Sequence, residues 1–457
     1  EINQYTSALA TLNSRIVDAA AQFGGQPPND LLDQRDQLIN EIATRIGITT
    51  VPQDDGSINV FTGSGQALVV GTTATQLGTA PDLYNSGTLE LTWGGQPITG
   101  QLSGGRIGGL LDARRELLEP MRNELGRIGA SLAEAVNAQN AQGIDALGRL
   151  GGDLLTTPVG AAYGSTLNSG NATMAVAIDD IAALDGSDYI FRFDGVAWSA
   201  ADSRTGASVP LSGSGTPADP LLVGGVAVTL SGSAQAGDRF LVRPTATVAG
   251  QLGLATNDPA RVAAASAVRV SATSGNTAQV GTLSVTDASD PALLTSTTIS
   301  FTGPNTYQIN GSGAYSYTAG TPISVNGWSL SLSGTPATGD SFSVSRGAVN
   351  SGDNSNARAL AQLGGQNLLD GGVSSLMGSQ SALTARAGSS AQQAQLQLDA
   401  QSAAYTQAKG ARESISGVNL DEEAADMIRF QQAYQAAAQI IQIANQVFQS
   451  LLDATRG

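Results

Sequence analysis

The sequence has 457 residues, 41% hydrophobic and 13% charged, with 22 basic and 38 acidic side chains, a formal net charge of −16, and no His or Cys. Roughly two to four domains fit this length, and the acidic excess argues against a nucleic-acid or anionic-membrane binder, because phosphate contacts need clustered Lys and Arg. Without His and Cys the commonest general base, the usual transition-metal ligands and the serine or cysteine triads are missing, so we expect no enzyme activity, cofactor or metal site.

Residues 1–47 carry two stretches of helical spacing. The first has apolar residues three and four positions apart, namely Ile2, Tyr5, Leu9, Leu12, Ile16, Ala19 and Phe23. No Ser, Thr, Asp or Asn cap precedes it, so we expect the helix to continue into a further N-terminal segment. The run from Pro27 to Asp30 ends this helix and caps a second one, which stops at Gly47. A helical hairpin is predicted.

From Ile48 to Thr99 the apolar period changes to two, which predicts a small β element with strands at 58–61, 67–70 and 89–93. Helical spacing then returns over residues 106–141, with Pro120 as a kink or restart. We assign residues 1–143 to the N-terminal part of a helical trunk domain.

Between residues 144 and 350 the chain is rich in Gly, Ser, Thr and Ala, with short alternating strands, which is typical of all-β modules. We expect a first β subdomain with its connector at 144–266 and a second β subdomain at 267–350. Asp258-Pro259 and the residues to Ala267 are predicted to form a short helical connector.

An internal repeat links the two expected β subdomains. Residues 225–243, GVAVTLSGSAQAGDRFLVR, align with residues 327–345, GWSLSLSGTPATGDSFSVS, at an offset of 102 positions (327 minus 225). Each Gly-Asp pair is interpreted as a turn that leads into a strand, so the two subdomains are expected to be related.

The composition changes again at Ser351, where the cluster 352–356 can cap a helix. A long helix with an Ala-rich seam follows, and residues 351–416 are assigned to the C-terminal part of the trunk domain. The side chains expected to pack between trunk helices are Tyr5, Leu9, Leu12, Ile16, Leu118, Leu125, Ile128, Leu132, Leu398 and Tyr405.

The last segment, 417–457, is predicted to be a separate helix. Asn419 can cap it, and acidic residues 421–423 face the positive end of the helix dipole. Its heptad seam supplies the candidate interface residues Leu420, Met427, Phe430, Tyr434, Ile441, Phe448 and Leu451. From Phe430 to Leu452 there is no charged residue and the polar side chains are mostly amides, which excludes a membrane span and suits burial among other helices. An ordinary amphipathic core helix is the alternative.

Other polar clusters have simpler interpretations. The acidic pairs at 54–55 and 179–180 lack EF-hand spacing and are assigned to turns. The run from Asp145 to Asp153 could hold a cation, but a glycine-rich loop is preferred, because its two carboxylates are eight positions apart (153 minus 145).

The C-terminal stretch 413–452, ESISGVNLDEEAADMIRFQQAYQAAAQIIQIANQVFQSLL, closely resembles the signature of the bacterial flagellar hook-associated protein 1 family. Four further blocks resemble the same family: 31–46, 105–142, the Gly-Asp-x-Phe strands, and 352–363. The resemblance implies an α+β multidomain protein, in which a discontinuous bundle of long N- and C-terminal helices forms a trunk with a small β element and two inserted all-β subdomains. The family's N-terminal helical segment, which pairs with the C-terminal helix, is missing from these residues.

The resemblance also implies a non-enzymatic structural adaptor that joins hook to filament as a ring-like layer of axial subunits. Its implied partners are other copies of itself, the hook protein, the second hook-filament junction protein and an export chaperone that binds the C-terminal helix. Its implied location is the extracellular flagellum, reached by type III export without a cleaved signal peptide.

Three alternatives remain open. Flagellin or the second junction protein would belong to the same class, but the C-terminal signature and the length argue against both. The repeated β modules could instead make the chain an adhesin or glycan-binding surface protein on a helical stalk. An enzyme carried in the outer modules is the third alternative, although no catalytic constellation is visible.

Overall fold

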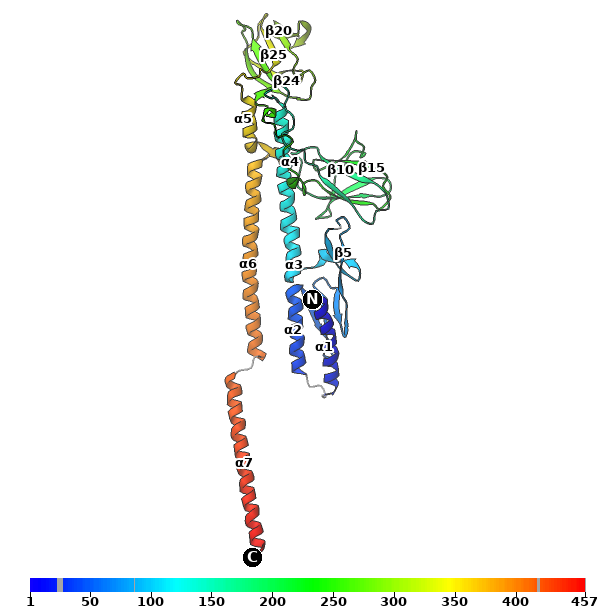
Figure 1. Ribbon diagram of the computed structural model, residues 1–457, viewed down its shortest axis with the longest axis vertical. Coiled ribbons are helices and arrows are strands. Elements are labelled where there is room, and N and C mark those ends of the chain that lie inside the picture. Colours follow the sequence, from blue (N-terminus) through cyan, green and yellow to red (C-terminus); the bar gives the residue numbers. More distant parts are fainter. Residues whose placement is uncertain (23–27, 86, 417–419, 457) are drawn as a thin grey trace. The chain divides into compact units, whose positions relative to one another are not determined.

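The computed structural model describes the chain except for residues 23–27, 86, 417–419 and 457. The chain divides into two compact units, residues 1–385 and 386–457, each described here by itself. Figure 1 shows the first unit as a helical trunk with two β modules attached to it. The mixture of long helices and several sheets confirms the predicted α+β multidomain class.

The N-terminal part of the first unit is a helical hairpin packed on two small sheets. The helices are α1 (Ile2–Gln22) and α2 (Asn29–Arg45). The first sheet contains β1 (Ile48–Pro52), β2 (Ile58–Thr62), β3 (Ala67–Val70) and β4 (Thr73–Ala74), and the second contains β5 (Leu77–Pro81), β6 (Leu89–Trp93) and β7 (Gln96–Pro97). The three predicted strands are thus confirmed as β2, β3 and β6. Pro28 stands at the start of α2 and no side chain caps that helix, contrary to the cap expected there.

A buried asparagine joins α1 to the first sheet. The Asn13 side chain is fully buried and donates hydrogen bonds to the carbonyl oxygens of Ile58 (2.8 Å) and Gly71 (2.7 Å). It also accepts a hydrogen bond from the Ile58 amide at 3.2 Å. Leu9, Ile42 and Val60 lie in the surrounding apolar core, so the helical hairpin and the β element share one core.

The predicted helix over 106–141 is interrupted by a π-helical turn. After η1 (Thr99–Gln101), α3 runs over Gly105–Asp112, the π-turn η2 over Ala113–Leu118 and α4 over Glu119–Ala141. Pro120 stands in the first turn of α4. Since proline has no backbone N–H, it is tolerated at this position, and the restart expected at Pro120 is confirmed.

The first β module follows the two-residue strand β8 (Gly143–Ile144). One sheet has the order β13-β12-β11-β16-β9 and the other β10-β15-β14. The strands are β9 (Ala161–Gly164), β10 (Thr173–Ile178), β11 (Tyr189–Phe193), β12 (Trp198–Asp202), β13 (Ser208–Val209), β14 (Leu221–Val223), β15 (Val226–Ser231) and β16 (Arg239–Arg243). Phe191, Val228 and Phe240 are in the core between the sheets.

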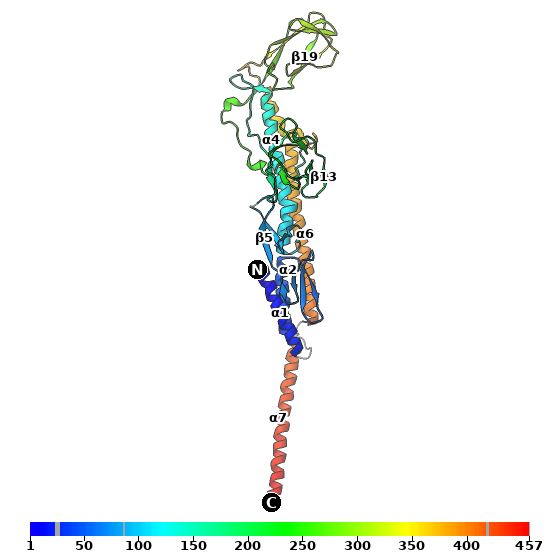
Figure 2. The ribbon, with the colours of Figure 1, turned by 90° about the vertical axis from the view of Figure 1, so that its right-hand side faces the viewer.

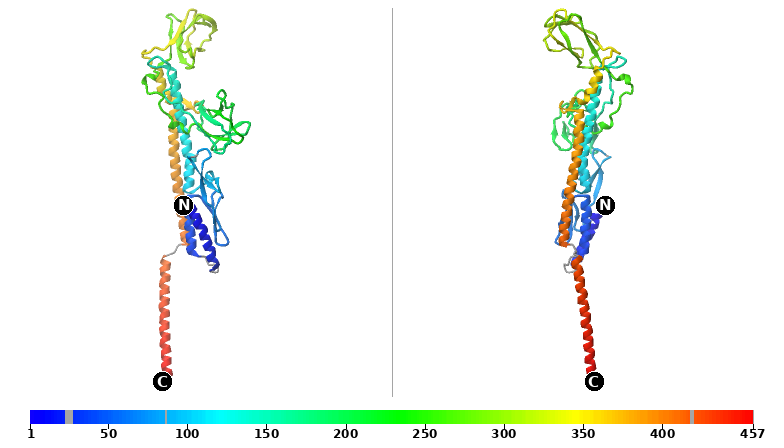
Figure 3. Two further views of the ribbon diagram at one scale, coloured as in Figure 1. Left: turned by 45° about the vertical axis from the view of Figure 1, so that its right-hand side comes forward. Right: turned by 90° about the vertical axis from the view of Figure 1, so that its left-hand side faces the viewer.

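The second β module repeats this topology. Its sheets have the orders β18-β25-β20-β21-β22 and β19-β24-β23. The strands are β18 (Val268–Ala272), β19 (Gln279–Val285), β20 (Thr297–Gly303), β21 (Thr306–Ile309), β22 (Ser312–Ser316), β23 (Ile323–Val325), β24 (Trp328–Ser333) and β25 (Ser341–Arg346). The repeated segments become β15 with β16 and β24 with β25, so the predicted relationship of the two modules is confirmed. Figure 3 shows the modules as separate lobes.

Two connections differ from the sequence predictions. The expected connector helix is helical only over η4 (Pro259–Arg261), after η3 (Val248–Gly250), and then forms β17 (Ala265–Ser266), which pairs with β8. Asp258 does cap η4, through a hydrogen bond from the Ala260 amide. The prediction of a helix to Ala267 is wrong because pairing with β8 extends the backbone.

The return to the trunk is also more divided than predicted. It consists of α5 (Ser355–Gln362), η5 (Leu363–Gly365) and a hairpin of β26 (Asn367–Leu369) and β27 (Ser374–Ser375), before α6 (Leu376–Ser416) begins. Figure 1 shows α5 beside the end of α4, and the turned view of Figure 2 agrees. The Gln139 side chain of α4 donates a hydrogen bond to Asn356 Oδ1 of α5 at 2.7 Å. The second unit contains the rest of α6 and α7 (Leu420–Arg456).

Candidate subunit interface

Helix α7 exposes almost all of its large apolar side chains. Its start carries Asp421, Glu422 and Glu423 in the first turn, as expected, while the predicted cap Asn419 lies outside the described residues. The exposed fractions run from 41% at Leu452 to 79% at Tyr434. The large apolar residues exposed on α7 are Met427, Ile428, Phe430, Tyr434, Ile440, Ile441, Ile443, Val447, Phe448, Leu451 and Leu452. We call this set the α7 apolar surface.

Of the seven predicted interface residues, six belong to the α7 apolar surface: Met427, Phe430, Tyr434, Ile441, Phe448 and Leu451. The side chain of Leu420 is outside the described residues. Scattered exposed apolar residues are normal, but eleven large ones on a single helix are more than a solvated helix usually carries, which makes α7 a candidate interaction surface. Within the second unit α6 also exposes Leu398 and Tyr405, two of the predicted trunk residues.

The other predicted trunk residues divide into three groups. Leu9, Leu12 and Ile16 are buried on α1, and Tyr5 is half-buried beneath the Arg45 guanidinium, 4.8 Å from the ring centroid. Ile128 and Leu132 on α4 are half-buried. Leu118 and Leu125 are exposed, so the described chain does not pack them as predicted.

The reason is that α4 turns a face of small side chains toward the first β module. An added Cβ at Gly126 would lie only 1.8 Å from the Thr245 carbonyl oxygen, which shows how closely the two backbones approach. Ala130 belongs to the core of the first module together with Val248. Of the large apolar residues that dominated the sequence pattern, Leu118 and Leu125 are left exposed.

Polar contacts surround this small-residue face. Arg122 Nε donates to the Ala246 carbonyl oxygen at 2.7 Å, and Asn123 Nδ2 donates to Asp188 Oδ1 at 3.1 Å. Asp188 is also paired with Arg243, with 2.9 Å between Nε and Oδ2. Burial raises the pKa of Asp188 overall, although Arg243 and Asn123 favour the ionised form.

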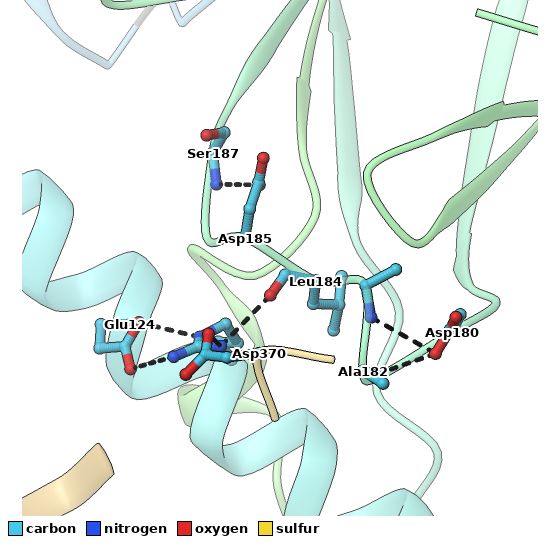
Figure 4. Close-up of polar contacts among 9 residues, drawn as sticks. Glu124, Asp180, Ala182, Leu184, Asp185, Ser187 and Asp370 are labelled. Carbon is cyan, nitrogen blue, oxygen red and sulfur yellow. Dashed lines mark hydrogen bonds and ion pairs between the residues drawn. The ribbon is translucent and has the colours of Figure 1, made fainter. Parts of the chain in front are cut away.

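Arg127 is the most connected side chain at this junction, and only 7% of its side chain is exposed. Nε and Nη2 donate to the two carboxylate oxygens of Glu124 at 2.9 and 2.8 Å. Nη1 donates to Asp370 Oδ1 at 2.7 Å and to the Leu184 carbonyl oxygen at 3.3 Å. Figure 4 shows Glu124, Leu184 and Asp370 converging on one point from three segments. This junction was not predicted from the sequence, since no local pattern links Arg127 to a carboxylate 243 positions away.

No helix in the described part of the chain is long and apolar enough to cross a membrane. Among the same residues there is no group of three or more acidic side chains placed to hold a metal ion. The Asp145 carboxylate, considered for a cation, instead accepts hydrogen bonds from the amides of Leu147 and Arg149 and pairs with the Arg149 guanidinium. The Asp145 carboxylate therefore binds donors of its own loop.

Three family models match the chain. Residues 1–155 match the flagellar hook-associated protein FlgK helical domain, and residues 163–244 match the flagellar hook-associated protein 1 D2-like domain. Residues 411–454 match the C-terminal model of the flagellar basal body rod FlgEFG proteins. The third match contains the whole α7 apolar surface.

Whole-chain comparisons agree with these models. The chain is 28% identical to flagellar hook-associated protein 1 of Salmonella typhimurium and 27% identical to that of Escherichia coli K12, in both cases over 99% of this chain and 69% of the relative. The solved structure of the flagellar hook junction protein FlgK from Burkholderia pseudomallei is 30% identical, with a TM-score of 0.78 over 91% of this chain and 82% of that chain.

Proposed function

The chain belongs to the flagellar hook-associated protein 1 family, and from this premise we propose how it joins its neighbours in the flagellum. It is a structural protein of the hook-filament junction. The adhesin alternative is not supported, because the matches along the whole chain are to flagellar hook-associated proteins. Its relatives are named flagellar hook-associated protein 1, and it is a flagellar, exported protein.

The α7 apolar surface carries the proposal. Each large side chain in such a surface contributes roughly 1.5–3 kcal/mol when it is fully buried. All eleven residues that form it are exposed, with exposed fractions between 41% and 79%. We infer that helices of neighbouring axial subunits cover it, so that copies of the chain form a ring-like layer. The uncharged amide positions between Phe430 and Leu452 suit this environment, because amides can be buried by pairing without the desolvation cost of ions.

The same inference predicts which other proteins contact the layer. We propose that the hook protein contacts one side of the layer and the second hook-filament junction protein the other. We also propose that an export chaperone shields the α7 apolar surface before secretion, and that the chain leaves the cell without a cleaved signal peptide. Leu118 and Leu125, exposed on η2 and α4, are further candidates for contacts with neighbouring subunits.

Complementation tests the proposal in a strain that lacks its own copy of this protein. The test variant replaces Phe430, Tyr434 and Ile441 with Ser, and the matched control replaces Gln431, Gln435 and Gln442 with Ser, so that both lose helix propensity in the same helix. Secretion into the medium is measured together with filaments seen by electron microscopy. We expect the test variant to be secreted in smaller amounts, because the proposed chaperone contacts the same surface, and to support no filaments, whereas the control is secreted normally and supports them.

Two outcomes would count against the proposal. Normal filaments with the test variant, or with a chain truncated after residue 419, would show that α7 does not join the neighbours. A variant that is retained inside the cell at normal levels would assign the surface to export instead of assembly.

A further inference from the structure

Three segments far apart in the sequence meet at Arg127. They are α4, the loop 180–187 of the first β module, and the β26–β27 hairpin that leads directly into α6. A second contact joins the last two without the arginine, since the Gly371 amide donates to the Ala182 carbonyl oxygen at 2.9 Å. The loop itself is held by Asp180, which accepts from the Ala182 amide, and by Asp185, which accepts from the Ser187 amide (Figure 4).

The tip of the β26–β27 hairpin is held mainly by the polar contacts of Asp370 and Gly371. Asp370 has a left-handed backbone conformation, φ 54°, and Val373 at the tip is exposed. An open pocket of about 410 Å³ lies between the hairpin, α4 and the first turns of α6, and is lined there by Ser374, Gly378 and Ser379. Leu369 is fully buried and anchors the base of the hairpin, whereas its tip is held to α4 and to the loop 180–187 by the Arg127–Asp370 pair and the Gly371 hydrogen bond.

We propose that Arg127 and the β26–β27 hairpin form a latch that couples the start of α6 to the docking of the first β module on α4. A displacement of α6 moves the hairpin that precedes it, and the hairpin carries both the carboxylate bound to Arg127 and the amide bound to the loop. When the hairpin moves away, Arg127 loses one of its two carboxylates and the loop 180–187 loses its Gly371 donor. The two sheets of the module stay folded while the module loosens on the trunk.

Hydrogen exchange on the full chain tests the latch. Asp370→Asn removes the charge but keeps a residue that tolerates the left-handed conformation. Asp112→Asn is the matched control, because it breaks an exposed ion pair between Asp112 at the end of α3 and Arg115 in the π-turn η2. We expect Asp370→Asn to speed exchange by about tenfold at the Gly371 amide and at the amides of 180–187, with β15 and β24 unchanged. The control should change none of these.

Other exchange patterns would overturn the latch. If Asp370→Asn speeds exchange only within 367–375, the hairpin is not coupled to the module. If β15 exchanges faster by the same factor, the variant destabilises the module as a whole.

A distance measurement gives an independent readout. The sequence has no cysteine, so labels can be placed at Val196→Cys, on an exposed turn of the first module, and at Leu118→Cys, exposed on the trunk. We expect a single narrow distribution of spin-label distances in the parent chain and a broad one with Asp370→Asn. An unchanged distribution would show that the module stays docked without the latch.

Discussion

Asp238 of the first β module and Asp340 of the second are 102 positions apart (340 minus 238) and bind equivalent backbone amides. Asp238 accepts from the amides of Gln235, Ser169 and Gly170, and Asp340 from those of Ala337, Thr277 and Ala278. Both aspartates are buried. Each one closes its own Gly-Asp turn and ties that turn to the loop before the opposite sheet.

Removing either carboxylate is expected to destabilise one module and not the other. Asp340→Ala leaves three amides without their acceptor, and we expect the free energy of unfolding of the second module to fall by about 3 kcal/mol. Trp93, Trp198 and Trp328 lie in or against three different cores, so variants that keep one tryptophan report each module separately in urea titrations. Asp238→Ala is the reciprocal control. Equal shifts of the Trp198 and Trp328 transitions by one variant would contradict this separation.

The second module is expected to lose stability in acid through Asp340. Burial opposes its ionisation, but hydrogen bonds from the amides of Ala278 and Thr277 outweigh burial and lower the pKa of Asp340 to about 2. Because the folded pKa lies below the unfolded one, the contribution is complete above about pH 4 and is lost as the pH falls toward 2. Urea midpoints of the Trp328-only chain between pH 6 and pH 2 measure it. Asp340→Asn cannot titrate and should show a shallower loss, whereas identical slopes would exclude Asp340 as the cause.

Two glycines on α4 provide a matched pair for its contact with the first module. Gly126→Ala would place a Cβ 1.8 Å from the Thr245 carbonyl oxygen, so we expect the helix to be pushed from the module at a cost of about 2 kcal/mol or more. Gly129→Ala has its nearest neighbour at 3.8 Å and should stabilise the chain by up to about 1 kcal/mol through helix propensity. Thermal unfolding of both variants checks the opposite signs. A neutral Gly126→Ala would mean that the backbones can separate freely.

The repeat could be predicted from sequence because its signals are local. Gly237 and Gly339 have φ angles of 98° and 100°, which only glycine adopts readily, and the aspartate after each glycine binds amides within its own turn. The positions of β2, β3 and β6 followed from alternation for the same reason. Such features depend on a few neighbouring residues, and the sequence contains all of them.

The contacts of α4 could not be predicted in this way. The large apolar residues at 118, 125 and 132 suggested the packed seam, whereas the closest approach uses Gly126 and Ala130. Small residues carry little signal in a hydrophobic pattern, although they allow the shortest distance between backbones. Likewise, the β26–β27 hairpin is fixed by Arg127 on a distant helix, so its sequence alone does not identify it.

Helix α7 should be weakly protected until other subunits cover it. Most helical stability in proteins comes from packing of an apolar face, and the α7 apolar surface is exposed in its own unit. In the monomeric full chain we expect amides of 420–456 to exchange much faster than those of β24, and to become protected in isolated hook-filament junctions.

Phe430→Ser should leave the urea midpoint of the monomer unchanged, because the side chain has little packing to lose, while Phe342→Ser in the second-module core should lower it. Strong protection of α7 in the monomer would mean that the chain covers this surface itself, and the proposed role in joining neighbouring subunits would then fail.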